Sequence, residues 1–65
     1  MKISINQQVL ELAENTTLKA ALEEFAAKSP YAIAINGEFI PQSEYASQIL
    51  SHQDAIEILY PVVGG

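Results

Sequence analysis

A chain of 65 residues forms one small domain, which buries only about 60% of the surface that its unfolded form exposes. Eight carboxylates, three lysines and no arginine give a net charge of −5, which disfavours nucleic acid and anionic membranes as partners. With no cysteine and a single histidine, His52, no disulfide, nucleophilic thiol or metal site is expected. Neither a signal peptide nor a membrane-spanning stretch is visible, so we expect a cytoplasmic protein.

Two short strands and one helix are predicted in the first half of the chain. Residues 2–6 alternate apolar and polar, as half-buried strands do, and residues 9–12 are predicted to return after a turn. Thr16 or Thr17 is expected to supply the N-cap of a helix of about three turns, which Pro30 ends. The apolar stripe of this helix has helical spacing and consists of Leu18, Ala21, Leu22, Phe25 and Ala26.

Three more strands are predicted in the second half. Residues 31–35 are apolar throughout, which indicates a strand in the interior of a sheet. The Asn-Gly pair at 36–37 predicts a tight turn into a short strand at 38–40. Residues 42–53 indicate an irregular or partly helical connection, and residues 55–60 alternate again as a last strand.

The predicted order is therefore β-β-α-β-β-β, which belongs to the α+β class. The single amphipathic helix must bury its stripe against one face of a small mixed sheet. This order resembles the ubiquitin-like β-grasp, in which the first and last strands lie parallel at the centre of the sheet. Pro61 has no N–H to donate to a neighbouring strand. We therefore expect a β-grasp domain over residues 1–61 and a flexible tail over residues 62–65.

The tail of Val62, Val63, Gly64 and Gly65 is the leading candidate site. Two glycines leave the carboxylate of Gly65 on a thin, adaptable arm, and four extended residues reach about 13 Å. This reach would let the tail thread the active site of a partner. A carboxylate is a poor electrophile, commonly activated by adenylation. Because the chain has no phosphate loop, cation cluster or evident metal site, a partner would have to supply ATP, Mg²⁺ and charge stabilisation. The alternative is an ordinary frayed terminus.

Over its whole length the chain resembles the ThiS family of bacterial thiamine-pathway sulfur carriers. The resemblance lies in residues 36–38, 40–41, 43–45, 54–58 and 64–65. It implies that an E1-like enzyme, ThiF, adenylates Gly65, which then receives sulfur that comes from cysteine through a desulfurase. The resulting thiocarboxylate would give its sulfur to thiazole synthase, ThiG, for the thiazole ring of thiamine. The chain would itself be a carrier that binds no cofactor, and not an enzyme.

A second candidate site lies on the face of the sheet away from the helix. Alternation along the last strand places Glu57 and Leu59 there. An apolar cluster of Leu59 with Phe39 or Ile40, beside Val62 of the tail, would dock the activating enzyme. Glu57 could pair with basic groups of that partner. The alternatives are that Leu59 is an ordinary half-covered residue and that Glu57 is only solvated.

Three other functions stay open at this point. The small subunit of molybdopterin synthase shares the fold and the thiocarboxylate chemistry, and Pro61 before the two valines is similar to that relative. A ubiquitin-like modifier would use the same acyl adenylate to join Gly65 to lysines of other proteins. A plain β-grasp binding module would make no use of its terminal glycines.

Overall fold

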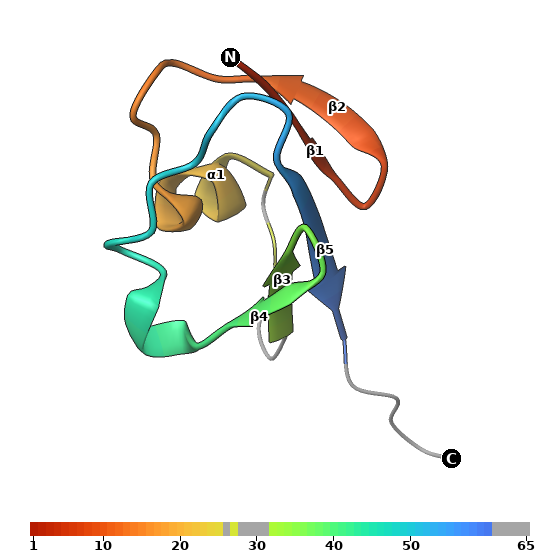
Figure 1. The fold of residues 1–65 in the computed structure, drawn as a ribbon, viewed down its shortest axis with the longest axis vertical. Helices are drawn as coiled ribbons and strands as arrows, with labels where there is room; N and C mark the ends of the chain where they lie inside the picture. Colours follow the sequence, from red (N-terminus) through yellow and green to blue (C-terminus); the bar gives the residue numbers. More distant parts are fainter. Residues whose placement is uncertain (26, 28–31, 61–65) are drawn as a thin grey trace.

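The computed structural model describes residues 1–25, 27 and 32–60, which form a five-stranded sheet with one helix on one face (Figure 1). The helix is α1 (Leu18–Phe25), and a short 3₁₀ helix, η1 (Gln42–Glu44), lies in the long connection before the last strand. The strands are β1 (Lys2–Ile5), β2 (Gln8–Glu11), β3 (Ala32–Ile35), β4 (Glu38–Ile40) and β5 (Ala55–Leu59). The predicted order β-β-α-β-β-β and the α+β class are confirmed.

The strands lie in the order β2-β1-β5-β3-β4, so the last strand of the chain occupies the centre of the sheet. β5 runs parallel to β1 and antiparallel to β3. β1 with β2 and β3 with β4 form antiparallel hairpins at the two sides. The expected parallel pair of first and last strands is therefore present, and it joins the two hairpins into one sheet.

Both hairpins turn through two residues with positive φ. Asn6 and Gln7 have φ of 49° and 71°, and Asn36 and Gly37 have φ of 51° and 85°. Positive φ at both central positions is the requirement of a type I′ turn, whose twist matches that of the flanking strands. Asparagine and glycine enter this region readily, whereas Gln7 does so at some cost. The turn at Asn6 and Gln7, which has the weaker sequence signal, thus has positive φ at both central residues, as the Asn36-Gly37 turn does.

The helix begins at Leu18, and Thr17 is its N-cap. The backbone N–H of Ala20 donates to Thr17 Oγ1 at 3.2 Å, which satisfies one of the donors that the first turn leaves unpaired. Thr16, the other predicted cap, instead donates from its hydroxyl to the carbonyl oxygen of Ala13 at 2.7 Å. Leu18, with the rest of the predicted stripe that is described, faces the sheet. The buried or half-buried stripe residues are Leu18, Ala21, Leu22 and Phe25.

The helix is shorter than predicted. Its 8 residues make about two turns, where the apolar spacing predicts about three. The N–H of Ala27 donates to the carbonyl of Leu22 at 3.0 Å, five residues back instead of four. A bond of this span is typical of a helix C-terminus. Ala26 and the predicted stop at Pro30 lie outside the described residues.

The core lies between α1 and the inward face of the sheet. Its most completely buried large side chains come from different elements, and they are Ile5, Leu18, Ile33 and Ile56. The connection from β4 to β5 runs on the same side of the sheet as α1 (Figure 1), where Tyr45 and Leu50 add to the core. Within the described residues, no helix has the length and apolar character needed to cross a membrane.

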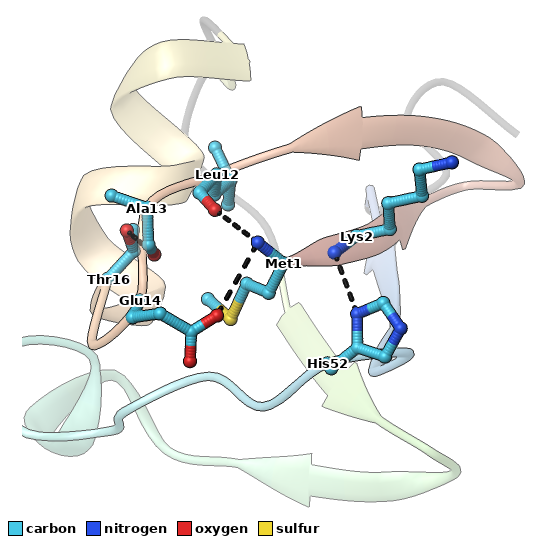
Figure 2. Close-up of polar contacts among 7 residues, drawn as sticks. All are labelled: Met1, Lys2, Leu12, Ala13, Glu14, Thr16 and His52. Atoms are coloured by element: carbon cyan, nitrogen blue, oxygen red, sulfur yellow. Dashed lines mark hydrogen bonds and ion pairs between the residues drawn. The ribbon is translucent and has the colours of Figure 1, made fainter.

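The start of β1 is held from two sides (Figure 2). The Met1 ammonium donates to the carbonyl of Leu12 at 2.7 Å and lies 3.6 Å from a carboxylate oxygen of Glu14. On the other side, the backbone N–H of Lys2 donates to Nδ1 of His52 at 2.9 Å. His52 thus has a structural role as an acceptor that ties the loop before β5 to β1. In the part of the chain that the structure describes, no three potential metal ligands come together.

Candidate functional site

β5 presents alternate residues to opposite faces of the sheet. Ile56 and Ile58 point into the core, and Glu57 and Leu59 point to the other face, where Leu59 is 55% exposed. The predicted orientation of this strand is therefore confirmed. Because β5 is central, the outward residues have neighbours on both sides and do not lie at a sheet edge.

The strand register places an aromatic side chain on the same face. Ala34 of β3 pairs with Glu57 on one side and with Phe39 of β4 on the other, so the three form one row across the sheet. Phe39 is 65% exposed. Ala32 pairs with Leu59 in the next row. Phe39 therefore lies on the same face as Leu59, one row away and two strands across.

Ile40, the other residue considered for this cluster, lies on the opposite face. It pairs with Ile33 and is only 7% exposed, because the side-chain period of a strand sends neighbouring residues to opposite sides. The idea that Ile40 borders the docking surface is therefore wrong. Ile40 belongs to the hydrophobic core between the sheet and α1.

A third exposed apolar residue, Val9, lies on this face and was not predicted. It pairs with Ser4, whose neighbours Ile3 and Ile5 point inward, and it is 67% exposed. The sequence could have shown this, because residues 9–12 alternate along a strand. Leu10 and Leu12 point inward, so Val9 must point outward. We call the surface formed by these outward residues the outer face. It consists of Lys2, Ser4, Val9, Glu11, Ala32, Ala34, Phe39, Ala55, Glu57 and Leu59.

Most side chains in the middle of the outer face are small, and larger apolar side chains lie toward its periphery. Ser4, Ala32, Ala34 and Ala55 contribute small side chains, so a partner could approach the backbone of the central strands closely. Val9 lies on one hairpin, Phe39 on the other, and Leu59 at the end of β5 that leads to the tail. Exposed apolar side chains grouped on one face often mark a protein interface.

The asparagines of the two hairpin turns hold β5 from both sides. Asn6 Oδ1 accepts a hydrogen bond from the backbone N–H of Ile58 at 2.9 Å. Asn36 Oδ1 accepts one from the N–H of Ala55, also at 2.9 Å. In each case the side chain continues the hydrogen bonding of β5 where the neighbouring strand has turned away. Sequence reasoning identified both residues as turn formers but missed this second role.

Asn36 also connects the β3–β4 turn to the loop before β5. Its Nδ2 donates to Asp54 Oδ1 at 3.1 Å, while the other oxygen of Asp54 accepts from the N–H of Ser51 at 2.8 Å. The course of β5 is fixed by these contacts at its start and by Asn6 near its end. The described chain continues to Tyr60. The tail residues Val62, Val63, Gly64 and Gly65, and the predicted boundary at Pro61, lie outside the described residues.

A mixed sheet with parallel first and last strands at its centre and one helix on one face is a ubiquitin-like β-grasp. The crystal structure of thiamine biosynthesis protein ThiS from Geobacter metallireducens has this fold, with a TM-score of 0.84 and 22% identity over 100% of both chains. A solution structure from the same organism matches with a TM-score of 0.77 and 22% identity over 100% of this chain and 88% of that one.

The sequence itself matches known relatives over its full length. It is 29% identical over 66 residues to the sulfur carrier protein ThiS of Escherichia coli strain K12, with 100% of both chains covered. The ThiS family model matches residues 2–65, so the chain belongs to the ThiS family.

Proposed function

We propose that this chain is a sulfur carrier of thiamine biosynthesis that is loaded at the carboxylate of Gly65. The observation that carries the proposal is the ThiS family match over residues 2–65, which includes both terminal glycines. Similarity to the E. coli sulfur carrier protein over 100% of both chains supports it. In this proposal the chain is acted on by enzymes and does not catalyse the reaction itself.

The chemistry begins with adenylation. The Gly65 carboxylate attacks the α-phosphate of ATP bound by ThiF, pyrophosphate leaves, and a mixed anhydride forms. A persulfide on the sulfur donor then attacks the anhydride carbon, AMP leaves, and an acyl disulfide forms. A thiol reduces this acyl disulfide, which releases the thiocarboxylate and leaves a disulfide between the thiol and the donor. The donor would be charged from cysteine by a desulfurase, and ThiG would use the sulfur to build the thiazole ring. A chain without cysteine carries this sulfur on its terminus alone.

The described domain would position the tail for this reaction. The outer face, with Leu59 and Glu57 on β5, would dock on ThiF while residues 62–65 enter the nucleotide site. Exposed apolar side chains at Val9, Phe39 and Leu59 support an interface on this face, because their burial against a partner is favourable. Hydrogen bonds from both hairpins to β5 support a fixed direction for the strand that leads to the tail.

Two relatives of this chemistry differ in the fate of the activated tail. The small subunit of molybdopterin synthase would carry the same thiocarboxylate to another acceptor, and a ubiquitin-like modifier would be attacked by lysine amines instead of sulfur. The ThiS family match favours the thiamine pathway over both. High-mass covalent adducts of the chain in its native cell would support the modifier instead.

The decisive experiment uses the absence of cysteine. The untagged chain is incubated with host lysate, Mg-ATP and cysteine, treated with a thiol-alkylating reagent and analysed by intact mass and fragmentation. We expect one alkyl group, mapped to Gly65. A matched chain that lacks Gly65 should remain unlabelled. If the full chain is not labelled while a control carrier is loaded in the same lysate, the proposed function is wrong.

A further inference from the structure

A hollow of about 440 Å³ opens between β1 and β5, close to the centre of the outer face. It exists because the two strands end at different points. β1 stops at Ile5 and turns away through Asn6 and Gln7, while β5 continues through Glu57 to Leu59. On its β1 side, Glu57 therefore has the turn, and not a strand, as its neighbour. The residues that line the hollow are Ser4, Asn6, Gln7, Ala55, Ile56 and Glu57.

The hollow offers hydrogen-bond acceptors and negative charge. Glu57 contributes a carboxylate, Gln7 an amide oxygen and Ser4 a hydroxyl oxygen. The side-chain oxygen of Asn6 already accepts from Ile58, which fixes one wall of the hollow in place. Among the described residues, none makes a hydrogen bond or an ion pair with the Glu57 carboxylate. Lys2, the lysine on the same face, lies opposite Glu11 of β2 in the strand register.

We infer that this hollow receives an arginine side chain of the protein that docks on the outer face. The inference rests on the proposed function, since it describes one contact of the same docking surface. A carboxylate covered by an apolar partner without a counter-charge is strongly unfavourable. A partner that buries Val9, Phe39 and Leu59 must therefore bring a cation to Glu57.

The shape and chemistry of the hollow favour arginine over lysine. A guanidinium has five N–H donors in a planar fork and can pair with both oxygens of Glu57 while it reaches Gln7 or Ser4. It is also more weakly hydrated than an ammonium and so loses less on leaving water. An ammonium would satisfy the charge but would leave more of these acceptors without a partner. Glu57, the one carboxylate among the residues that line the hollow, thus selects a partner surface with a matched arginine.

The test uses the complete chain and the purified E1-like enzyme of the same host, with ATP–pyrophosphate exchange as the readout. Glu57→Gln keeps the size of the side chain and removes the charge. We expect the KM for the variant to rise on the order of 30-fold, because one partner of a desolvated charge pair is lost. Glu24→Gln is the matched control, since it removes the same charge from the exposed surface of α1 on the other layer. It should leave KM within about twofold.

A second measurement identifies the partner residue. The enzyme is treated with phenylglyoxal, which modifies arginine, and labelled sites are mapped by mass spectrometry. Saturating unmodified chain should protect one arginine, and Glu57→Gln at equal occupancy should leave that arginine reactive. Protection of a lysine from acetylation in its place, or an unchanged KM for Glu57→Gln, would overturn the inference while activation of Gly65 still stood. If the unmodified chain is not activated at all, the proposed function fails, and the inference fails with it.

Discussion

The side-chain carbonyl oxygen of Asn6 accepts a hydrogen bond at 2.9 Å from the backbone N–H of Ile58, a residue 52 positions away in sequence. The backbone N–H of Asn6 donates to the carbonyl of Ile56 at 2.9 Å. Asn6 therefore extends the pairing of β1 and β5 by one residue after the backbone of β1 has entered its turn. On its β1 side, the end of β5 is therefore held by a turn residue, while on its other side it pairs with β3 up to Leu59.

Replacing Asn6 with glycine should test this contact. Glycine accepts the positive φ of 49° but removes the acceptor, so the amide of Ile58 loses its partner. We expect the free energy of unfolding to fall by about 1–2 kcal/mol in urea denaturation, with faster hydrogen exchange at Ile58. Asn6→Asp keeps an oxygen at the same place and should restore slow exchange. Equal exchange rates in both variants would show that the side-chain acceptor is unimportant.

Removing the helix cap should destabilise the domain moderately. Thr17→Ala leaves the N–H of Ala20 without its side-chain acceptor, and we expect a loss of about 1 kcal/mol in the free energy of unfolding. Thr17→Ser retains the hydroxyl and should recover most of that loss. Thr16→Ala should lower the free energy of unfolding less than Thr17→Ala does. The Thr16 hydroxyl donates to the carbonyl of Ala13, before the helix begins, and does not cap the helix.

Truncation in the core should be far more damaging. Ile33 is completely buried on the inward face of β3, and Ile33→Ala is expected to cost about 2–5 kcal/mol. Total stability of about 0.05–0.15 kcal/mol per residue makes this loss comparable to the whole stability of so small a domain. We therefore expect circular dichroism to show an unfolded or largely unfolded chain at 37 °C. Ile33→Val, at about 0.5–1.5 kcal/mol, should remain folded.

A charge placed on the outer face should prevent docking without unfolding the chain. Leu59 is 55% exposed, so Leu59→Asp should change the unfolding midpoint little and raise the KM for the activating enzyme at least about tenfold. Ile49→Asp is a matched control, because Ile49 is 50% exposed and pairs with Thr17 on the helix side. An unchanged KM for Leu59→Asp, or an equal rise for both variants, would remove Leu59 from the interface.

Deleting Gly65 should separate folding from activation. The shortened chain is expected to keep the same urea midpoint and to lose ATP–pyrophosphate exchange completely, because its terminal carboxylate no longer reaches the α-phosphate. Gly64→Val should retain the reacting carboxylate but fit the channel poorly, and so raise KM. Normal sulfur loading of the shortened chain would contradict the role of Gly65.

Most of the fold could be predicted because its elements are marked locally. Alternation along β1 and β5, the Asn-Gly pair at 36–37 and the cap at Thr17 each act over a few residues. The predicted helix is too long, because apolar spacing cannot show where the helical hydrogen bonding ends. It ends where the N–H of Ala27 donates to the carbonyl of Leu22, five residues back instead of four. Strand alternation also predicted the outward direction of Glu57 and Leu59.

Features that depend on register between distant strands could not be predicted in the same way. Phe39 and Ile40 are neighbours in sequence, and only the pairing of β4 with β3 shows which one is exposed. The contact of Asn6 with Ile58 and the hollow beside Glu57 both follow from the point at which β1 ends relative to β5. A local pattern carries no information about that offset.

The hydrogen bonds of Asn36 have a consequence for the chemical ageing of the chain. In an Asn-Gly pair, the glycine nitrogen can attack the asparagine side-chain carbonyl, expel ammonia and form a cyclic imide, which water opens to aspartate or isoaspartate. Here the side-chain oxygen is held by the N–H of Ala55 at 2.9 Å and the side-chain nitrogen by Asp54 at 3.1 Å. Attack by Gly37 requires both bonds to break. The rate of deamidation at Asn36 therefore reports how often the β3–β4 turn separates from the start of β5. Each such conversion would place a second carboxylate beside Asp54 and weaken the hold of the turn on the central strand.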